Sequence, residues 1–168
     1  TRRSFLGSTV LAGAALPFAG SAEARPGRTG DFVYEIQRTE EEWRKRLSDF
    51  EYLVLRESAT EWAKSSDLWD DYREGEFHCR GCDMHVYSSN WRVELDKGWV
   101  FFSNAQPTNV LMDIDTAADY SMSGAGERTM IEAHCRRCGS HLGHILTVEG
   151  QLVHCINGTS LNFKPANA

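Results

Sequence analysis

Two Cys-x-x-Cys pairs constrain this chain more than any other feature of its sequence. They are Cys79 and Cys82 in "HCRGC" and Cys135 and Cys138 in "HCRRC", and 52 residues separate them. Each pair lies at a predicted strand-to-turn boundary, where a tight turn lets two sulfur atoms point at one ion. Four thiolates at about 2.3 Å from one ion are typical of a structural zinc site. The spacing therefore predicts one zinc ion bound by all four cysteines.

Other uses of these cysteines stay open at this point. The pairs are also compatible with two disulfides or with redox-active dithiols, and iron can replace zinc in a four-thiolate site. A closed site of this kind contributes to folding, because no coordination position is left for a substrate. His78 and His134 each precede the first cysteine of a pair, and we expect them beside the site or at the surface.

Length and composition indicate one folded domain without a nucleic-acid partner. The chain has 168 residues, of which 41% are hydrophobic and 25% are charged. A chain of this length can bury a core without disulfides. Its formal net charge is -6, whereas nucleic-acid-binding domains usually carry a basic face.

The N-terminal segment resembles a twin-arginine export signal. Arg2 and Arg3 precede a modest apolar run and then Ala22-Glu23-Ala24, which has the form of a small-residue cleavage site. The run is too short and too interrupted to span a membrane. The twin-arginine route exports folded proteins to the periplasm, so a metal site can be assembled in the reducing cytoplasm. We expect a signal in residues 1–24, a linker in 25–37 and the folded domain in 38–168.

Local patterns predict a helical segment followed by a mainly β domain. Residues 38–58 read as helix, with a capping box of Thr39 and Glu42 and a break at Ser48-Asp49. Residues 59–77 have no clear period and are predicted to form a loop. Trp43, Trp62, Trp69 and Trp91 are expected to be core aromatics. The strand candidates, which alternate with turn residues, are 85–89, 98–103, 108–114, 128–135, 144–148, 151–155 and 160–165. Strands of this kind indicate antiparallel pairing.

Cys155 has no cysteine partner nearby and is the candidate for chemistry. A free cysteine is often buried and inert, and this interpretation stays open. However, His141 and His144 in "SHLGHI" can stabilise a thiolate and deliver protons. Asn157 follows Cys155 by two residues, so both project from the same face of a strand. Together these residues favour a Cys/His nucleophilic site.

Longer motifs resemble a known family. "HCRRCGSHLGHI" followed by "HCINGTSLNF" is similar to the methionine-R-sulfoxide reductase family, the MsrB type, which carries Cys-x-x-Cys, His-Leu-Gly-His and a late Cys-Ile-Asn-Ser segment in this order. Upstream, "EEEWRKRLSDFEYLVLRESATE" looks like the family's opening helices. "GWVFF" occupies the place of its Gly-Trp-Pro-Ser-Phe. The likeness covers about residues 38–165.

The resemblance implies a fold of two antiparallel sheets with N-terminal helices and a structural zinc ion. It also implies reduction of methionine-R-sulfoxide, peptide-bound or free. Cys155 matches the catalytic cysteine, whose thiolate attacks the sulfoxide sulfur, releases methionine and becomes a sulfenic acid. His141 and His144 match histidines that supply and position protons. Asn157 matches an asparagine near the nucleophile, and Trp99 matches the tryptophan that walls the pocket for the substrate methyl group.

The chain departs from the family pattern at several positions. Val148 stands where an active-site acid is common, and Val153 where an arginine is common. Replacing both is self-consistent, because losing one alone would strand a charge. A resolving cysteine, common just before the tryptophan motif, is absent from "ELDKGW". We therefore expect a thioredoxin-like or glutaredoxin-like protein to reduce Cys155 as an external thiol donor.

The leading interpretation is an exported enzyme that repairs methionine-R-sulfoxide in envelope proteins or as the free amino acid. The alternative is a non-catalytic, zinc-stabilised β binding domain of the same architecture, with Cys155 buried. A third is a thiol enzyme that acts on an adduct other than a sulfoxide. Val148 and Val153 favour the binding domain, whereas the retained cysteine, histidines, asparagine and tryptophan favour the reductase.

Overall fold

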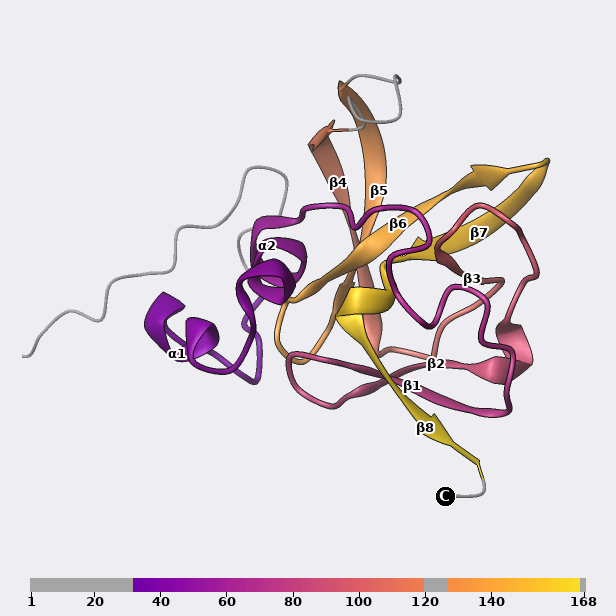
Figure 1. Ribbon diagram of the computed structural model, residues 1–168. Helices are drawn as coiled ribbons and strands as arrows, with labels where there is room; N and C mark the ends of the chain where they lie inside the picture. Colours follow the sequence, from indigo (N-terminus) through magenta and orange to yellow (C-terminus); the bar gives the residue numbers. More distant parts are fainter. Residues whose placement is uncertain (1–31, 120–126, 167–168) are drawn as a thin grey trace, which may run out of the picture.

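The structure of this chain, a computed structural model, describes residues 32–119 and 127–166 (Figure 1). The segment predicted to be an export signal, 1–24, and most of the predicted linker, 25–37, lie outside the described residues. The boundaries predicted for signal, linker and domain therefore stay predictions.

Two antiparallel sheets make up most of the described chain, as the resemblance implies. The smaller sheet has the order β2-β1-β8. Its strands are β1 (Gly75–Cys79), β2 (His85–Ser88) and β8 (Leu161–Pro165). The larger sheet has the order β3-β7-β6-β5-β4. Its strands are β3 (Val100–Phe102), β4 (Val110–Asp119), β5 (Glu127–Cys135), β6 (His141–Val148) and β7 (Gln151–Ile156).

Strand β1 corrects the predicted loop over residues 59–77. Gly75, Glu76 and Phe77 belong to β1, which pairs with β2 on one side and with β8 on the other. The partner β8 lies about 80 residues further along the chain, so local sequence carries no sign of that pairing. Long-range hydrogen bonding thus makes a strand from a segment without a local period.

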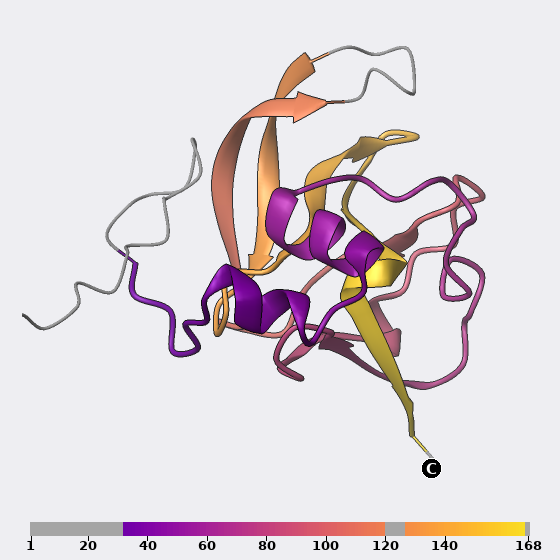
Figure 2. The same ribbon diagram turned by 60° about the vertical axis from the view of Figure 1, so that its left-hand side comes forward.

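Two short helices, α1 (Glu40–Arg44) and α2 (Asp49–Glu57), lie together on one side of the sheets (Figure 2). Both begin with a capping box, in which Ser or Thr and Glu side chains satisfy free backbone N–H groups. Thr39 caps α1 and Ser48 caps α2, which explains the break predicted at Ser48. Neither of the described helices is long and apolar enough to cross a membrane.

The main core lies between the sheets and α2. Its largest fully buried side chains include Phe77, Tyr87 and Phe102, whose rings contact one another across the sheets. Trp43 is buried, as predicted, but the expectation for Trp62 is wrong, since 63% of it is exposed. Trp62 belongs to the surface segment between α2 and β1, which has no second layer to cover it. The remaining two tryptophans of that set, Trp69 and Trp91, are half-buried.

Candidate catalytic pocket and metal site

Cross-strand pairing places Cys155 at the centre of a row of side chains on the larger sheet. Cys155 of β7 pairs with Phe101 of β3 and with His144 of β6. His144 pairs in turn with Glu132 of β5. Residues directly opposite each other project from the same face of an antiparallel sheet. The fold thus brings the predicted cysteine and one predicted histidine side by side.

A pocket of about 220 Å³ opens beside Cys155. Its walls are mainly apolar, formed by Trp99, Phe101, Leu146 and Val148, and His144 and Asn157 also line it. Most of the surface that lines the pocket is therefore suited to contact a small apolar group. The Trp99 indole Nε1 donates a hydrogen bond to the Glu61 carbonyl oxygen at 3.2 Å, which fixes the ring. Trp99 thus lies in a wall of the pocket, the position that the resemblance implies.

Burial controls the ionisation of Cys155. Loss of hydration inside the pocket, with a smaller contribution from the negative charge of Glu61, raises the pKa of the thiol from its ordinary 9.0 to about 12. At neutral pH the resting group is therefore the neutral thiol. Its proton stays with the sulfur until a partner accepts it.

Each predicted histidine is paired with a carboxylate that the sequence did not reveal. The Nδ1 atom of His141 lies 2.7 Å from Glu132, and the Nε2 atom of His144 lies 3.0 Å from Asp115. A carboxylate accepts a hydrogen, so Nδ1 of His141 and Nε2 of His144 each carry one, and the two rings face their carboxylates with different nitrogens. Burial, followed by the nearby His141, lowers the pKa of His144. The ring next to Cys155 is therefore neutral at pH 7.

His141 lies deeper than His144. It is fully buried and is not among the pocket-lining residues, and its ring centroid is 5.1 Å from that of His144. Its Nε2 atom has no hydrogen-bond partner among the described residues. Its other ring nitrogen, Nδ1, is the one that Glu132 holds.

Asn157 and Glu61 hold the segment that follows Cys155. The Asn157 side chain accepts a hydrogen bond from the Glu61 backbone N–H at 3.0 Å and donates one to the Leu142 carbonyl at 3.1 Å. The buried Glu61 carboxylate accepts the backbone N–H groups of Gly158 and Thr159 at 2.7 and 2.8 Å. Both ends of the Asn157 amide are thus engaged with backbone, so its role here is to position the pocket. Glu61 is the last residue of the segment "EEEWRKRLSDFEYLVLRESATE". The resemblance of that segment to the family is the one sequence signal that points to Glu61.

Gly143 allows β6 to approach β7 closely beside the pocket. A Cβ atom at this position would lie 2.2 Å from the carbonyl oxygen of Cys155. Such a contact is far shorter than any van der Waals distance, so the backbone would have to shift. The glycine of "HLGH" is therefore needed for the position of Cys155.

Val148 and Val153, at positions where the resemblance implies an acid and an arginine, form apolar surface in this chain. Val153 is buried with Leu95 and Phe101 in a small apolar cluster, and Val148, Trp99 and Cys155 pack against it. No isolated charge is left behind in this cluster. The same apolar surroundings remove water from Cys155, which is the main cause of its raised pKa.

The other four cysteines converge at the main core, apart from the small apolar cluster that contacts Cys155. Their sulfur atoms all lie within 4.8 Å of one another, with 3.8 Å between Cys79 and Cys138 and 3.5 Å between Cys82 and Cys135. Sulfur atoms bound to one ion at about 2.3 Å in a tetrahedron lie about 3.8 Å apart. None of the five cysteines forms a disulfide. The four thiols therefore form a site that fits a metal ion, and the disulfide alternative does not apply.

The two cysteine turns have the same backbone shape. The residue after each second cysteine, Asp83 or Gly139, has a left-handed conformation, with φ of 60° and 67°. Its N–H donates to the carbonyl of the first cysteine, Cys79 or Cys135, at 2.7 and 2.8 Å. This turn aims both sulfur atoms of a pair at one point. Gly81, inside the first pair, is required for packing, since a Cβ there would lie 2.7 Å from the Ser140 hydroxyl.

The four thiols shift one another's pKa values, and this mutual effect favours a bound cation. Hydrogen bonds with Cys135 lower the pKa of Cys138 and raise that of Cys79. Hydrogen bonding with Cys135 also lowers the pKa of Cys82. Without a cation, the group therefore does not favour four thiolates. A divalent cation is what ionises the remaining thiols in a site of this composition.

Comparison with known proteins identifies the family. Residues 47–165 match the SelR domain. The peptide methionine sulfoxide reductase MsrB of Thiobacillus denitrificans is 34% identical over 132 residues, covering 76% of this chain and 94% of that protein. The MsrB protein of Leifsonia xyli is 33% identical over 142 residues, which cover 81% and 96%. The chain belongs to the MsrB family. The MsrB protein of Methanosarcina barkeri, 36% identical over 134 residues, covers 77% of this chain and 88% of its own length.

Proposed function

We propose that this chain reduces the R epimer of methionine sulfoxide with Cys155 as the nucleophile. The observation that carries the proposal is the position of the Cys155 thiol in a pocket that combines apolar walls with a neutral histidine. The apolar walls suit the methyl group of the substrate, and Trp99 forms one of them. Membership of the MsrB family, whose relatives are named peptide methionine sulfoxide reductases, supports reduction of a methionine sulfoxide.

The raised pKa of Cys155 shapes the proposed chemistry. A sulfoxide oxygen leaves only when it is protonated, and a neutral thiol brings both the sulfur nucleophile and a proton. The Cys155 sulfur forms a bond to the substrate sulfur, and the S–O bond breaks as the protonated oxygen leaves. That oxygen then bonds to the Cys155 sulfur while the bond between the two sulfur atoms breaks, and methionine leaves with the electron pair. The balance is thiol plus sulfoxide to sulfenic acid plus methionine. His144 lies beside Cys155 in the register of the sheet and carries the proton between thiol and sulfoxide oxygen.

An external thiol is proposed to restore the enzyme. The other four cysteines are gathered in the metal site, so the sulfenic acid has no resolving partner inside the chain. One thiol of a thioredoxin-like or glutaredoxin-like protein condenses with the sulfenic acid and releases water. A second thiol of the same donor reduces the resulting mixed disulfide.

Zinc is the proposed occupant of the four-cysteine site. Four thiolates with no open coordination position match the preference of zinc and its structural role. Cys79, Cys82, Cys135 and Cys138 would hold it and so join β1 to β5. The twin-arginine-like segment supports export, and we propose a periplasmic site of action where the enzyme repairs oxidised methionine in envelope proteins.

Turnover of separated epimers tests the proposal. The wild-type chain and Cys155→Ser are incubated with dithiothreitol and with the R or S epimer of a methionine-sulfoxide peptide, and methionine is followed by chromatography. Turnover of the R epimer alone, lost in Cys155→Ser, is the expected result. Absence of turnover in a folded, metal-bound protein would replace the reductase with the binding domain. The valines at 148 and 153 and the half-buried, neutral thiol favour that second function.

A further inference from the structure

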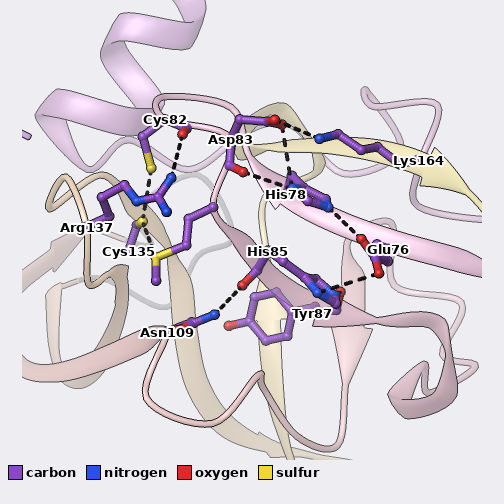
Figure 3. A network of polar contacts seen from close by, with 11 residues as sticks. Glu76, His78, Cys82, Asp83, His85, Tyr87, Asn109, Cys135, Arg137 and Lys164 are labelled. Carbon is purple, nitrogen blue, oxygen red and sulfur yellow. Dashed lines mark hydrogen bonds and ion pairs between the residues drawn. The ribbon is translucent and has the colours of Figure 1, made fainter.

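A second group of metal-ligating side chains lies on the smaller sheet, apart from the four cysteines and from Cys155. Glu76, His78 and His85 each offer one ligand atom, and these atoms lie within 4.8 Å of one another (Figure 3). His78 of β1 pairs with His85 of β2, and their rings stack with centroids 5.1 Å apart. The pairing of β1 with β2 thus builds the cluster.

Hydrogen bonds to backbone carbonyls fix which nitrogen of each ring carries a hydrogen. The Nδ1 atom of His78 lies 2.9 Å from the Asp83 carbonyl, and the Nε2 atom of His85 lies 2.8 Å from the Tyr87 carbonyl. A carbonyl oxygen only accepts, so these two nitrogens donate. The amide of Gln106 also lies 3.0 Å from His85 Nε2 and accepts this hydrogen when its oxygen faces the ring.

The remaining nitrogens, His78 Nε2 and His85 Nδ1, face the same carboxylate, and either of them presents a lone pair to it when it carries no hydrogen. His78 Nε2 is 2.9 Å from one oxygen of Glu76, and His85 Nδ1 is 3.8 Å from the other. Three acceptor atoms that converge in this way repel one another unless a positive charge lies among them. A proton on His78 relieves one of these contacts, whereas a cation bound by all three atoms relieves both.

We propose that Glu76, His78 and His85 bind a divalent transition-metal ion, with zinc as the first candidate. Two imidazole nitrogens and a carboxylate oxygen form a donor set that such ions favour. Donor atoms around a tetrahedral ion with bonds of about 2.1 Å lie about 3.4 Å apart, between the two distances to Glu76. Metal-bound histidines commonly donate their other N–H to a backbone carbonyl, and both rings do so here.

The surroundings of the cluster suit entry of an ion from solvent. The Glu76 side chain is 54% exposed and that of His85 is 26% exposed, whereas His78 is largely covered. The hydrogen bond with His78, with a smaller contribution from His85, lowers the pKa of Glu76, so the carboxylate is charged at neutral pH. A bound ion would keep water as a further ligand and cross-link β1 to β2, one residue from Cys79.

Zinc stoichiometry of the full chain tests this proposal. The protein, purified without a polyhistidine tag, is dialysed against rising concentrations of free zinc, and bound metal is measured by elemental analysis. We expect binding beyond the ion held by the four cysteines. X-ray absorption should then show nitrogen and oxygen neighbours in addition to sulfur. Glu76→Gln and His85→Gln should weaken the additional binding at least about tenfold, since loss of an outer hydrogen bond alone typically costs 10–100-fold.

Asp83→Asn is the matched control. It removes one exposed negative charge next to His78, as Glu76→Gln does, but it leaves the Asp83 carbonyl and all three ligands in place. The control should bind the additional ion as the wild type does. The proposal is overturned if the wild type never binds more than the cysteine-held ion. It is also overturned if Asp83→Asn and Glu76→Gln weaken the additional binding equally, which would indicate general attraction to surface charge.

Discussion

Alkylation of Cys155 should accelerate about tenfold for each pH unit from about pH 6.5 to about pH 10, without levelling off. Iodoacetamide reacts with the thiolate, so its rate follows the ionised fraction of the thiol. Burial raises the pKa of Cys155 to about 12. At pH 7 a thiol with that pKa is ionised to about one part in 10⁵. The difference from the ordinary value of 9.0 corresponds to about 4 kcal/mol against the thiolate.

The assay follows the peptide that contains Cys155 by mass spectrometry after timed alkylation, so the metal-site cysteines do not contribute. Free glutathione, measured in parallel, should level off as its own exposed thiol ionises. Glu61→Gln should lower the pKa of Cys155, because the Glu61 charge is the second cause of the shift. A Cys155 rate that reaches a plateau at or below about pH 9 would refute the argument that the apolar pocket holds the thiol neutral.

Three further outcomes follow from the geometry. Gly143→Ala should lower the free energy of unfolding by about 2–4 kcal/mol in urea titrations, because its Cβ would meet the Cys155 carbonyl at 2.2 Å. Gly150→Ala, which has no atom within 4 Å of its Cβ, should cost only about 1 kcal/mol of backbone strain. Removing the metal with a chelator should lower the melting temperature by more than about 10 °C, and an unchanged melting temperature would contradict a structural site. Because burial lowers the pKa of His144 below its ordinary 6.5, the unfolded chain binds more protons, so stability should fall as the pH drops below 6.5. His144→Gln should lessen that fall, and an identical pH profile would show that His144 is not responsible.

Local signals predicted the convergence of the four cysteines correctly, because the geometry of each pair is encoded over about five residues. A Cys-x-x-Cys turn aims two sulfur atoms wherever it occurs, and the matched spacing indicated that two turns share one ion. Helix capping is equally local, since Thr39 and Glu42 contact each other three residues apart. Features of this kind depend little on the rest of the fold.

The carboxylates that serve the pocket were not predictable from local sequence. Asp115 and Glu132 reach His144 and His141 only because β4, β5 and β6 lie in register in one sheet. A glutamate in the apolar stretch "TMIEAHC" is unusual, and this was the one local hint that Glu132 has a buried partner. The resemblance supplied the histidines, but not the acids that fix their tautomers.

The same fold uses cysteine in two opposite ways, and the difference arises from neighbours rather than from the residue itself. Four thiols converge within 4.8 Å, where the mutual contact of their sulfur atoms favours a cation that ionises them all. Cys155 lies apart from them, against Val153 and Phe101, where loss of water favours the neutral thiol. An acid and an arginine in place of the two valines would bring charge and water close to Cys155. The apolar surroundings therefore favour the thiol form of Cys155, and in the proposed reaction the carboxylate-paired histidines handle the proton.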